Sequence, residues 1–127
     1  MAAFTENASL IAIADDDESV RRAVTRLLRS RGFVAHAFAS AEEFLQSAAM
    51  REVSCLICDV RMPGISGLEL QARMTAQNLR TPIIFITAFH DVRIRWKALE
   101  AGAVCFLKKP FKSKELIECV ERALRTL

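Results

Sequence analysis

Residues 9–19 read SLIAIADDDES, an apolar run that leads directly into three consecutive carboxylates. The run LIAIA at 10–14 is short and uncharged, which is typical of a strand covered on both faces of a sheet. Asp15, Asp16 and Asp17 follow at once, and carboxylates crowded this closely repel one another unless a cation lies among them. The stretch therefore predicts a buried strand with a cation site at its carboxyl end.

Similar apolar runs alternate with amphipathic stretches along the rest of the chain. Further strands are expected at 33–38, 53–58, 82–87 and 104–107, each covered on both faces. Helix-capping residues open the amphipathic stretches: Ser40 and Ser66, each followed by Glu three residues later, then Asp91 and Ser113. Five such β-α units, joined by right-handed crossovers, predict an α/β protein with a parallel sheet and helices on both faces.

The composition fits a single domain with an ordinary core. The chain has 127 residues, of which 52% are hydrophobic. Its 18 Lys and Arg against 15 Asp and Glu give no basic footprint for nucleic acid, and no apolar stretch is long enough to span a membrane. Residues 1–8 lack signal-peptide features and are expected to form a flexible tail, with the domain at 9–127.

The four cysteines fit a reducing cytosol better than a disulfide framework. Cys55 and Cys58 are three residues apart, and on a strand such residues point to opposite faces, so we expect no shared metal. Cys105, in a predicted strand, and Cys119, in a predicted helix, are expected to be small apolar core residues.

Polar residues end four of the five predicted strands. The carboxyl ends of parallel strands meet at one edge of the sheet, where ligands bind in folds of this kind. Carboxylate oxygens suit Mg²⁺, a hydroxyl and a lysine can bind phosphoryl oxygens, and an aspartate can be the phosphoryl acceptor. The residues concerned are Asp15, Asp16, Asp59, Thr87 and Lys109.

These motifs resemble the receiver domain of bacterial two-component response regulators over residues 9–126. The resemblance lies in the acidic cluster, DVRMPGISG at 59–67, Thr87 within FITA and KPF at 109–111. The sequences of these motifs are most similar to the FixJ-like branch of the family. It implies a CheY-like, doubly wound five-stranded sheet of order 2-1-3-4-5 with five helices.

The resemblance also implies roles for individual residues. Asp59 would accept a phosphoryl group from a phosphohistidine on a sensor histidine kinase. Mg²⁺ would be bound by Asp15, Asp16, Asp59 and the backbone carbonyl of Arg61. The chain would then be a phosphoacceptor and not a turnover enzyme.

The remaining roles concern the response to phosphorylation. Thr87 and Lys109 would contact the phosphoryl group, with the Lys109–Pro110 bond cis and Lys108 in solvent. Thr87 and Phe106 would form the switch. The readout would be the face made by the helix between Asp91 and Gly102, the strand 104–107 and the last helix. Through it the resemblance implies a phosphorylation-dependent homodimer that regulates transcription in the cytoplasm, with a C-terminal DNA-binding effector domain beyond this chain.

Several alternatives stay open at the level of sequence. Residues 15–19 spell D-x-D-x-S, as in haloacid-dehalogenase-type phosphatases, where Asp15 would be the nucleophile and Asp17 the general acid; no acidic pair after Lys109 completes that metal site. A receiver-like module that is not phosphorylated is another alternative. Asp17 could simply support the following helix, Phe89 could control water near the acceptor, and Trp96 could be an interface anchor or an edge residue.

Overall fold

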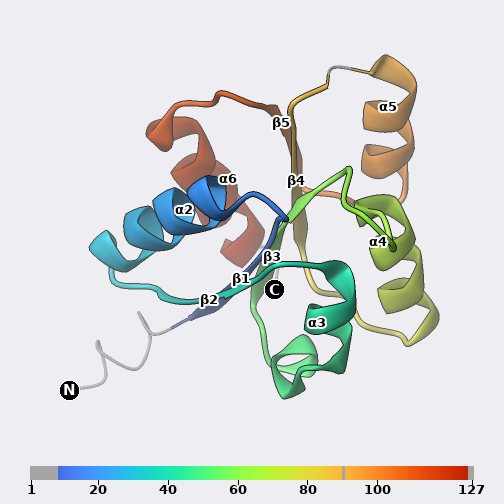
Figure 1. Cartoon of the computed structure of the whole chain (residues 1–127), viewed down its shortest axis with the longest axis horizontal. Helices are drawn as coiled ribbons and strands as arrows, with labels where there is room; N and C mark the ends of the chain where they lie inside the picture. Colours follow the sequence, from blue (N-terminus) through green and yellow to red (C-terminus); the bar gives the residue numbers. More distant parts are fainter. Residues whose placement is uncertain (1–8, 90, 126–127) are drawn as a thin grey trace.

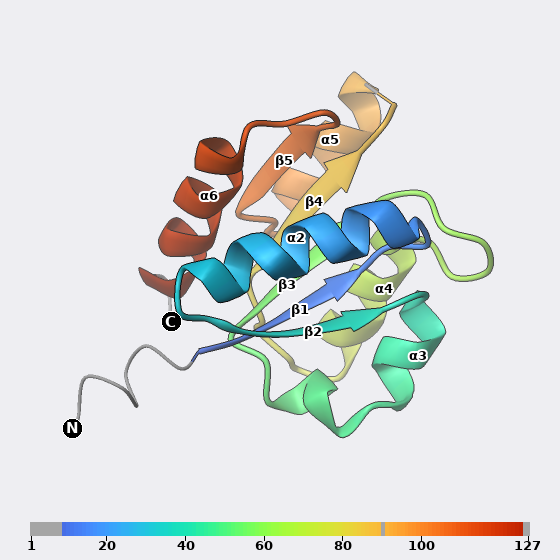
Figure 2. The same cartoon turned by 60° about the vertical axis from the view of Figure 1, so that its left-hand side comes forward.

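The computed structural model describes residues 9–89 and 91–125, so the predicted tail at 1–8 and the last two residues of the predicted domain lie outside the described residues. Within this part, five parallel strands form one sheet of order β2-β1-β3-β4-β5 (Figure 2), which confirms the expected order. The strands are β1 (Leu10–Ala14), β2 (Val34–Phe38), β3 (Cys55–Asp59), β4 (Ile83–Thr87) and β5 (Cys105–Lys108).

Helices cover both faces of the sheet, as predicted (Figure 1). One face carries α2 (Glu18–Ser30) and α6 (Ser113–Arg125), and the other carries α3 (Ala41–Gln46), α4 (Gly67–Ala76) and α5 (Val92–Glu100). A short 3-10 turn, η1 (Ala48–Arg51), was not predicted. None of these helices is both long and apolar enough to cross a membrane.

The core divides into two layers because successive strand residues point to opposite faces. Ile11 and Ile57 pack with α2 and α6, whereas Leu56 and Phe85 pack with α3, α4 and α5. Cys55 and Cys58 fall in different layers, which confirms that they point to opposite faces of the sheet.

The two edge strands depart from the expected burial. The central strands β3 and β4 are buried along their whole length, but only Ala35 is buried in β2 and only Cys105 in β5. The expectation that every strand is covered on both faces is therefore wrong for β2 and β5, because they form the edges of the sheet.

The predicted caps open the helices. The Ser40 hydroxyl accepts from the Glu43 N–H, and the Asp91 carboxylate accepts from Arg93 N at 2.9 Å. Asp17 caps α2 by accepting from Ser19 N at 2.8 Å, so it supports the helix. In the second capping box, the Ser66 hydroxyl accepts from the Glu69 N–H as expected. The Glu69 carboxylate pairs with Arg73 and not with the backbone of Ser66.

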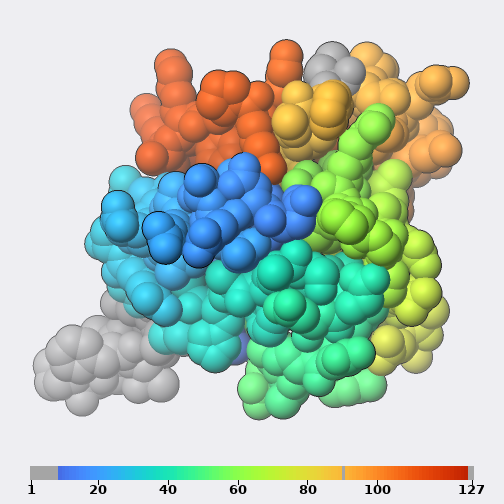
Figure 3. Space-filling view, viewed as in Figure 1, coloured from blue at the N-terminus to red at the C-terminus, as the bar shows by residue number. Residues whose placement is uncertain are grey.

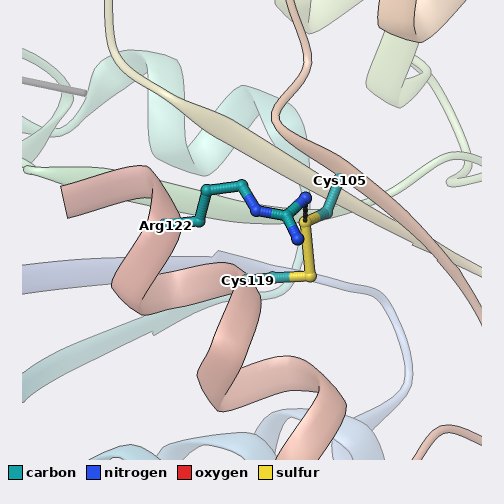
Figure 4. The surroundings of a disulfide bond; sticks show 3 residues. All are labelled: Cys105, Cys119 and Arg122. Atoms are coloured by element: carbon teal, nitrogen blue, oxygen red, sulfur yellow. Dashed lines mark hydrogen bonds between the residues drawn. A yellow bond between two sulfur atoms is a disulfide. The ribbon is translucent and has the colours of Figure 1, made fainter. Parts of the chain in front are cut away.

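A disulfide joins Cys105 on β5 to Cys119 on α6 (Figure 4). Both residues are buried as expected, but the prediction that they are unbonded apolar residues is wrong. The helix packs across the strand with the two Cα atoms 6.1 Å apart, a separation that a disulfide spans. Their spacing of 14 residues in the sequence gave no sign of this contact.

Candidate functional site

Three carboxylates meet at the carboxyl ends of β1 and β3. An oxygen atom of each of Asp15, Asp16 and Asp59 lies within 4.8 Å of the other two. Asp15 is completely buried and Asp59 is 7% exposed, whereas Asp16 is exposed to solvent. The segments that follow β1, β3, β4 and β5 adjoin one another on this side of the molecule (Figure 3), so the sheet brings the predicted residues to one edge.

Lys109 reaches this cluster from the segment after β5. Its Nζ atom lies 2.9 Å from Oδ2 of Asp15 and 3.4 Å from Oδ2 of Asp59. Its backbone N–H donates to the Thr87 carbonyl at 2.7 Å, which fixes the segment against β4. Lys108 is exposed and the Lys109–Pro110 bond is cis, so both expectations are confirmed.

The electrostatics of the cluster favour an additional cation. Burial raises the pKa of Asp59, and the charge of Asp15 raises it further, against the opposing effects of Lys109 and the Arg61 N–H. Burial opposes the charge on Lys109, but its hydrogen bond to Asp15 and the two carboxylate charges raise its pKa overall. Three carboxylates around one ammonium leave negative charge unbalanced.

The Thr87 hydroxyl lies at the end of β4 and is bonded within its own loop. It donates to the Phe89 carbonyl at 3.1 Å and accepts from the Phe89 N–H at 3.1 Å. Thr87 itself is 1% exposed. The structure therefore places Thr87 beside the Lys109 backbone, with its hydroxyl holding the segment that leads into α5.

A second contact joins the loops after β3 and β4. The guanidinium of Arg61 lies 4.8 Å from the centre of the Phe89 ring, which is largely exposed. The Arg61 backbone N–H donates to Oδ1 of Asp59 at 3.2 Å, so Arg61 borders the acceptor candidate and Phe89 contacts Arg61. Phe106 lies further along β5, partly buried, with its ring 6.4 Å from that of Phe85.

One residue that shapes the site, Glu42, was not predicted from the sequence. Glu42, on α3, accepts from the backbone N–H of Ile65 at 3.1 Å and so holds the loop that follows Asp59. Gly64 has φ +78°, and a Cβ atom there would collide with the Glu42 carboxylate. The other oxygen, Oε1, is buried and has no hydrogen-bond partner in the structure. A glutamate in the first turn of a capped helix is ordinary, so the sequence carried no signal for this contact.

The glycine at the start of α4 also serves the site. A Cβ atom on Gly67 would collide with the backbone carbonyl oxygen of Asp59. Gly67 therefore lets the helix begin directly against the end of β3, which places the loop between them beside the acidic cluster.

Comparisons with known proteins agree with this architecture. Residues 11–121 match the family described as the response regulator receiver domain. The chain is 44% identical over 115 residues to Nodulation protein W of Bradyrhizobium diazoefficiens, covering 91% of this chain and 51% of that protein. It is 41% identical over 122 residues to Response regulator protein TodT of Pseudomonas putida, covering 96% and 54% of the two proteins. The crystal structure of FixJ-N superposes with a TM-score of 0.85 at 38% identity, covering 94% of this chain and 95% of that one.

The chain belongs to the response regulator receiver domain family, the signalling domains of two-component systems. It spans about half the length of the curated relatives it matches.

Proposed function

We propose that Asp59 accepts a phosphoryl group from a phosphohistidine of a sensor histidine kinase, with Mg²⁺ bound beside it. The observation that carries this proposal is the Lys109 ammonium between two buried carboxylates, at the edge where four strands deliver polar groups. A charge cluster of this kind serves no packing role, since buried charges destabilise a fold unless they are well paired.

The residues present fit a magnesium ion. Asp15, Asp16 and Asp59 offer carboxylate oxygens within 4.8 Å of one another, and the Arg61 carbonyl in the next loop is the fourth expected ligand. Oxygen donors of this type and the exposed position of Asp16, which admits water, suit the coordination of Mg²⁺. When bound, the ion supplies positive charge that offsets the carboxylates and the incoming phosphoryl oxygens.

The chain's own residues perform the transfer. A carboxylate oxygen of Asp59 forms the new bond to phosphorus while the P–N bond of the phosphohistidine breaks and its electron pair stays on the imidazole. Lys109, already within hydrogen-bond distance of the Asp15 carboxylate, turns toward the new phosphoryl oxygens and stabilises their charge.

Thr87 couples the new group to the rest of the molecule. Its hydroxyl has one proton to donate and currently gives it to the Phe89 carbonyl. Donating that proton to a phosphoryl oxygen breaks the bond to Phe89 and releases the segment before α5. Phe106, on the neighbouring strand β5, then turns inward, so that phosphorylation shifts the population between two packings of the α5-β5-α6 face.

That face is suited to a partner. Val92 and Trp96 are 66% and 61% exposed on α5, and exposed aromatic residues of this kind are frequent interface anchors. We infer a phosphorylation-dependent homodimer through α5, β5 and α6. We infer further a cytoplasmic protein whose C-terminal DNA-binding domain regulates transcription. The similarity to Transcriptional regulatory protein FixJ of Bradyrhizobium diazoefficiens, 40% identical over 115 residues, supports the role in transcription.

The phosphatase alternative is not favoured by the site. Asp15, its nucleophile, is completely buried and accepts from both Asp17 N and Lys109 Nζ. Asp17, its general acid, is the helix cap of α2. The chain therefore acts as a phosphoacceptor with a single acceptor site and no turnover of substrate.

One assay separates these functions. The chain is incubated with Mg²⁺ and acetyl phosphate, and its intact mass is measured; we expect a gain of about 80 Da, the mass of one phosphoryl group. Asp59→Asn should abolish the gain, and Asp91→Asn, which alters a helix cap away from the cluster, should keep it. Continuous release of phosphate from many esters per chain, lost in Asp15→Asn, would instead support the phosphatase.

A further inference from the structure

The disulfide lies in a groove on the face that we assign to readout. Cys105 and Cys119 both line a hollow of about 410 Å³ between α5 and α6, with Arg95, Phe106 and Arg122 among its other walls. Figure 4 shows Cys119 and Arg122 projecting from α6 toward Cys105 on β5, with Nη1 of Arg122 3.5 Å from the Cys105 sulfur. The disulfide therefore lines the hollow on the α5-β5-α6 face.

We propose that Cys105 and Cys119 form a reversible thiol–disulfide pair that controls how this face responds to phosphorylation. The control of the response rests on the proposed function, whereas the thiol chemistry does not. The pair is a second input: one signal arrives as phosphate at Asp59, and the other as an oxidant at β5.

The other two cysteines, Cys55 and Cys58, have surroundings that disfavour the thiolate, which sets them apart from the proposed reactive pair. Burial raises the pKa of the Cys55 thiol to about 12, and burial with the charges of Asp59 and Asp15 raises the pKa of the Cys58 thiol as well. Both lie within the central strand β3 and stay as thiols. Cys105 instead has a guanidinium beside its sulfur, an arrangement that stabilises a thiolate.

A small-molecule disulfide such as glutathione disulfide can be the oxidant that forms the Cys105–Cys119 bond, in two steps of thiol–disulfide exchange. The Cys105 thiolate attacks one of its sulfurs and releases one glutathione thiolate. The Cys119 thiolate then attacks the Cys105 sulfur of the mixed disulfide, which forms the S–S bond and releases the second glutathione thiolate. Two electrons pass to the small disulfide, and its two thiolates take up the protons that the cysteines lost.

The bond would restrain the switch because of its position on β5. Cys105 immediately precedes Phe106, and β5 pairs with β4 so that Phe106 lies opposite Phe85 and Lys108 opposite Thr87. A disulfide tolerates Cα separations of only about 4.4 to 6.8 Å. It therefore holds β5 against α6 in the present arrangement, where Thr87 is still bonded to Phe89. Oxidation should disfavour the rearranged face and weaken the response to phosphate.

In the cytoplasm that we propose for this protein, the disulfide would form only when the redox conditions change. In a reducing cytosol, disulfides that form are usually transient and redox-sensing. Reducing conditions would leave the pair open and the receiver fully responsive. An oxidant would close the pair and reduce the output at the same level of phosphorylation.

The first experiment tests the chemistry on the unaltered chain. The chain is equilibrated in glutathione buffers of increasing oxidised fraction, free thiols are alkylated, and the peptides are mapped by mass spectrometry. We expect the intact mass, measured before alkylation, to be lower by about 2 Da in the oxidised chain, and the mapped peptides of Cys105 and Cys119 to be cross-linked. Cys55 and Cys58 remain unlinked and serve as internal controls. A chain that forms no such bond in any buffer would overturn the proposal.

The second experiment tests the coupling. Trp96, the single tryptophan of the chain, is exposed on α5 and reports the rearrangement of that helix by fluorescence. On phosphorylation with acetyl phosphate and Mg²⁺, we expect the change in emission to be about threefold smaller in the oxidised chain than in the reduced chain. Cys119→Ala should respond like the reduced chain in both buffers.

The outcomes separate the two proposals. Equal phosphoryl uptake in both redox states with equal Trp96 responses would overturn the redox control and leave the proposed function intact. Absence of uptake in both states would overturn the proposed function and the control with it. Comparing one chain in two redox states needs no substitution, so the result does not depend on whether a variant folds.

Discussion

At the scale of single residues, the Lys109 ammonium does not fully neutralise the carboxylates that surround it. Its ammonium is shared between Asp15 and Asp59, and it is closer to Asp15 by half an ångström, at 2.9 Å against 3.4 Å. Asp59 is therefore the less completely paired of the two buried carboxylates. That imbalance leaves its oxygens available to a phosphoryl group.

The raised pKa of Asp59 has a consequence for stability. A carboxyl whose pKa is higher in the folded state than in the unfolded chain destabilises the fold once it is ionised. The penalty is absent below the usual aspartate range and complete above the raised folded value. We expect Asp59→Asn to raise the melting temperature near neutral pH without Mg²⁺ by a few degrees, equivalent to about 1 kcal/mol.

Calorimetry across pH checks this expectation. The gain should shrink as the pH falls through the acidic range, and it should shrink when Mg²⁺ stabilises the unaltered chain. Asp91→Asn is the matched control: it removes a carboxylate charge outside the cluster but keeps an oxygen that caps α5, so the melting temperature should stay nearly unchanged. A lower melting temperature for Asp59→Asn at neutral pH without Mg²⁺ would show that the pairing with Lys109 outweighs the crowding.

At the scale of elements, the site depends on how the loop after β3 is held by α3. Glu42 accepts from Ile65 N and leaves its other oxygen buried without a partner, which is costly in a packed structure. We expect Glu42→Ala to slow phosphoryl uptake from acetyl phosphate about tenfold, because the loop that carries Arg61 loses its anchor. Glu42→Gln retains an acceptor oxygen and should restore most of the rate.

A neighbouring carboxylate provides the control. Glu43 lies on the same helix and accepts from Ala39 N, so Glu43→Ala removes a carboxylate without touching the loop. Its uptake rate should equal that of the unaltered chain, although both alanine variants lose some stability. Equal uptake rates for Glu42→Ala and Glu43→Ala would contradict the proposal that Glu42 positions the loop after β3.

The positions of the strands and helices were the features that the sequence predicted best. Alternation of apolar runs with capped amphipathic stretches predicted every strand to within two residues, and Ser40 and Asp91 open helices as expected. The exposure of β2 and β5 was not foreseen, because strand composition does not show which strands lie at the edges. The turn η1 was missed because its four residues are too few for a periodic signal.

At the scale of the whole molecule, the convergence of the site follows from topology. Parallel strands deliver their carboxyl ends to one edge, so Asp15, Asp59 and Lys109 could be brought together from the sequence although 94 residues separate the first from the last. The choice of partners could not be predicted in the same way. Side-chain packing across elements decides that Glu42 meets Ile65 and that Cys105 meets Cys119, and the local turn after β4 decides that Thr87 bonds to Phe89.

The most direct test of the central claim is to locate the phosphoryl group itself. The chain is phosphorylated with acetyl phosphate in the presence of Mg²⁺, digested, and its peptides are sequenced by mass spectrometry. We expect one modified residue, Asp59, and loss of the modification when Mg²⁺ is chelated. A phosphoryl group found on Asp15 or on any other residue, with Asp59 unmodified, would contradict it.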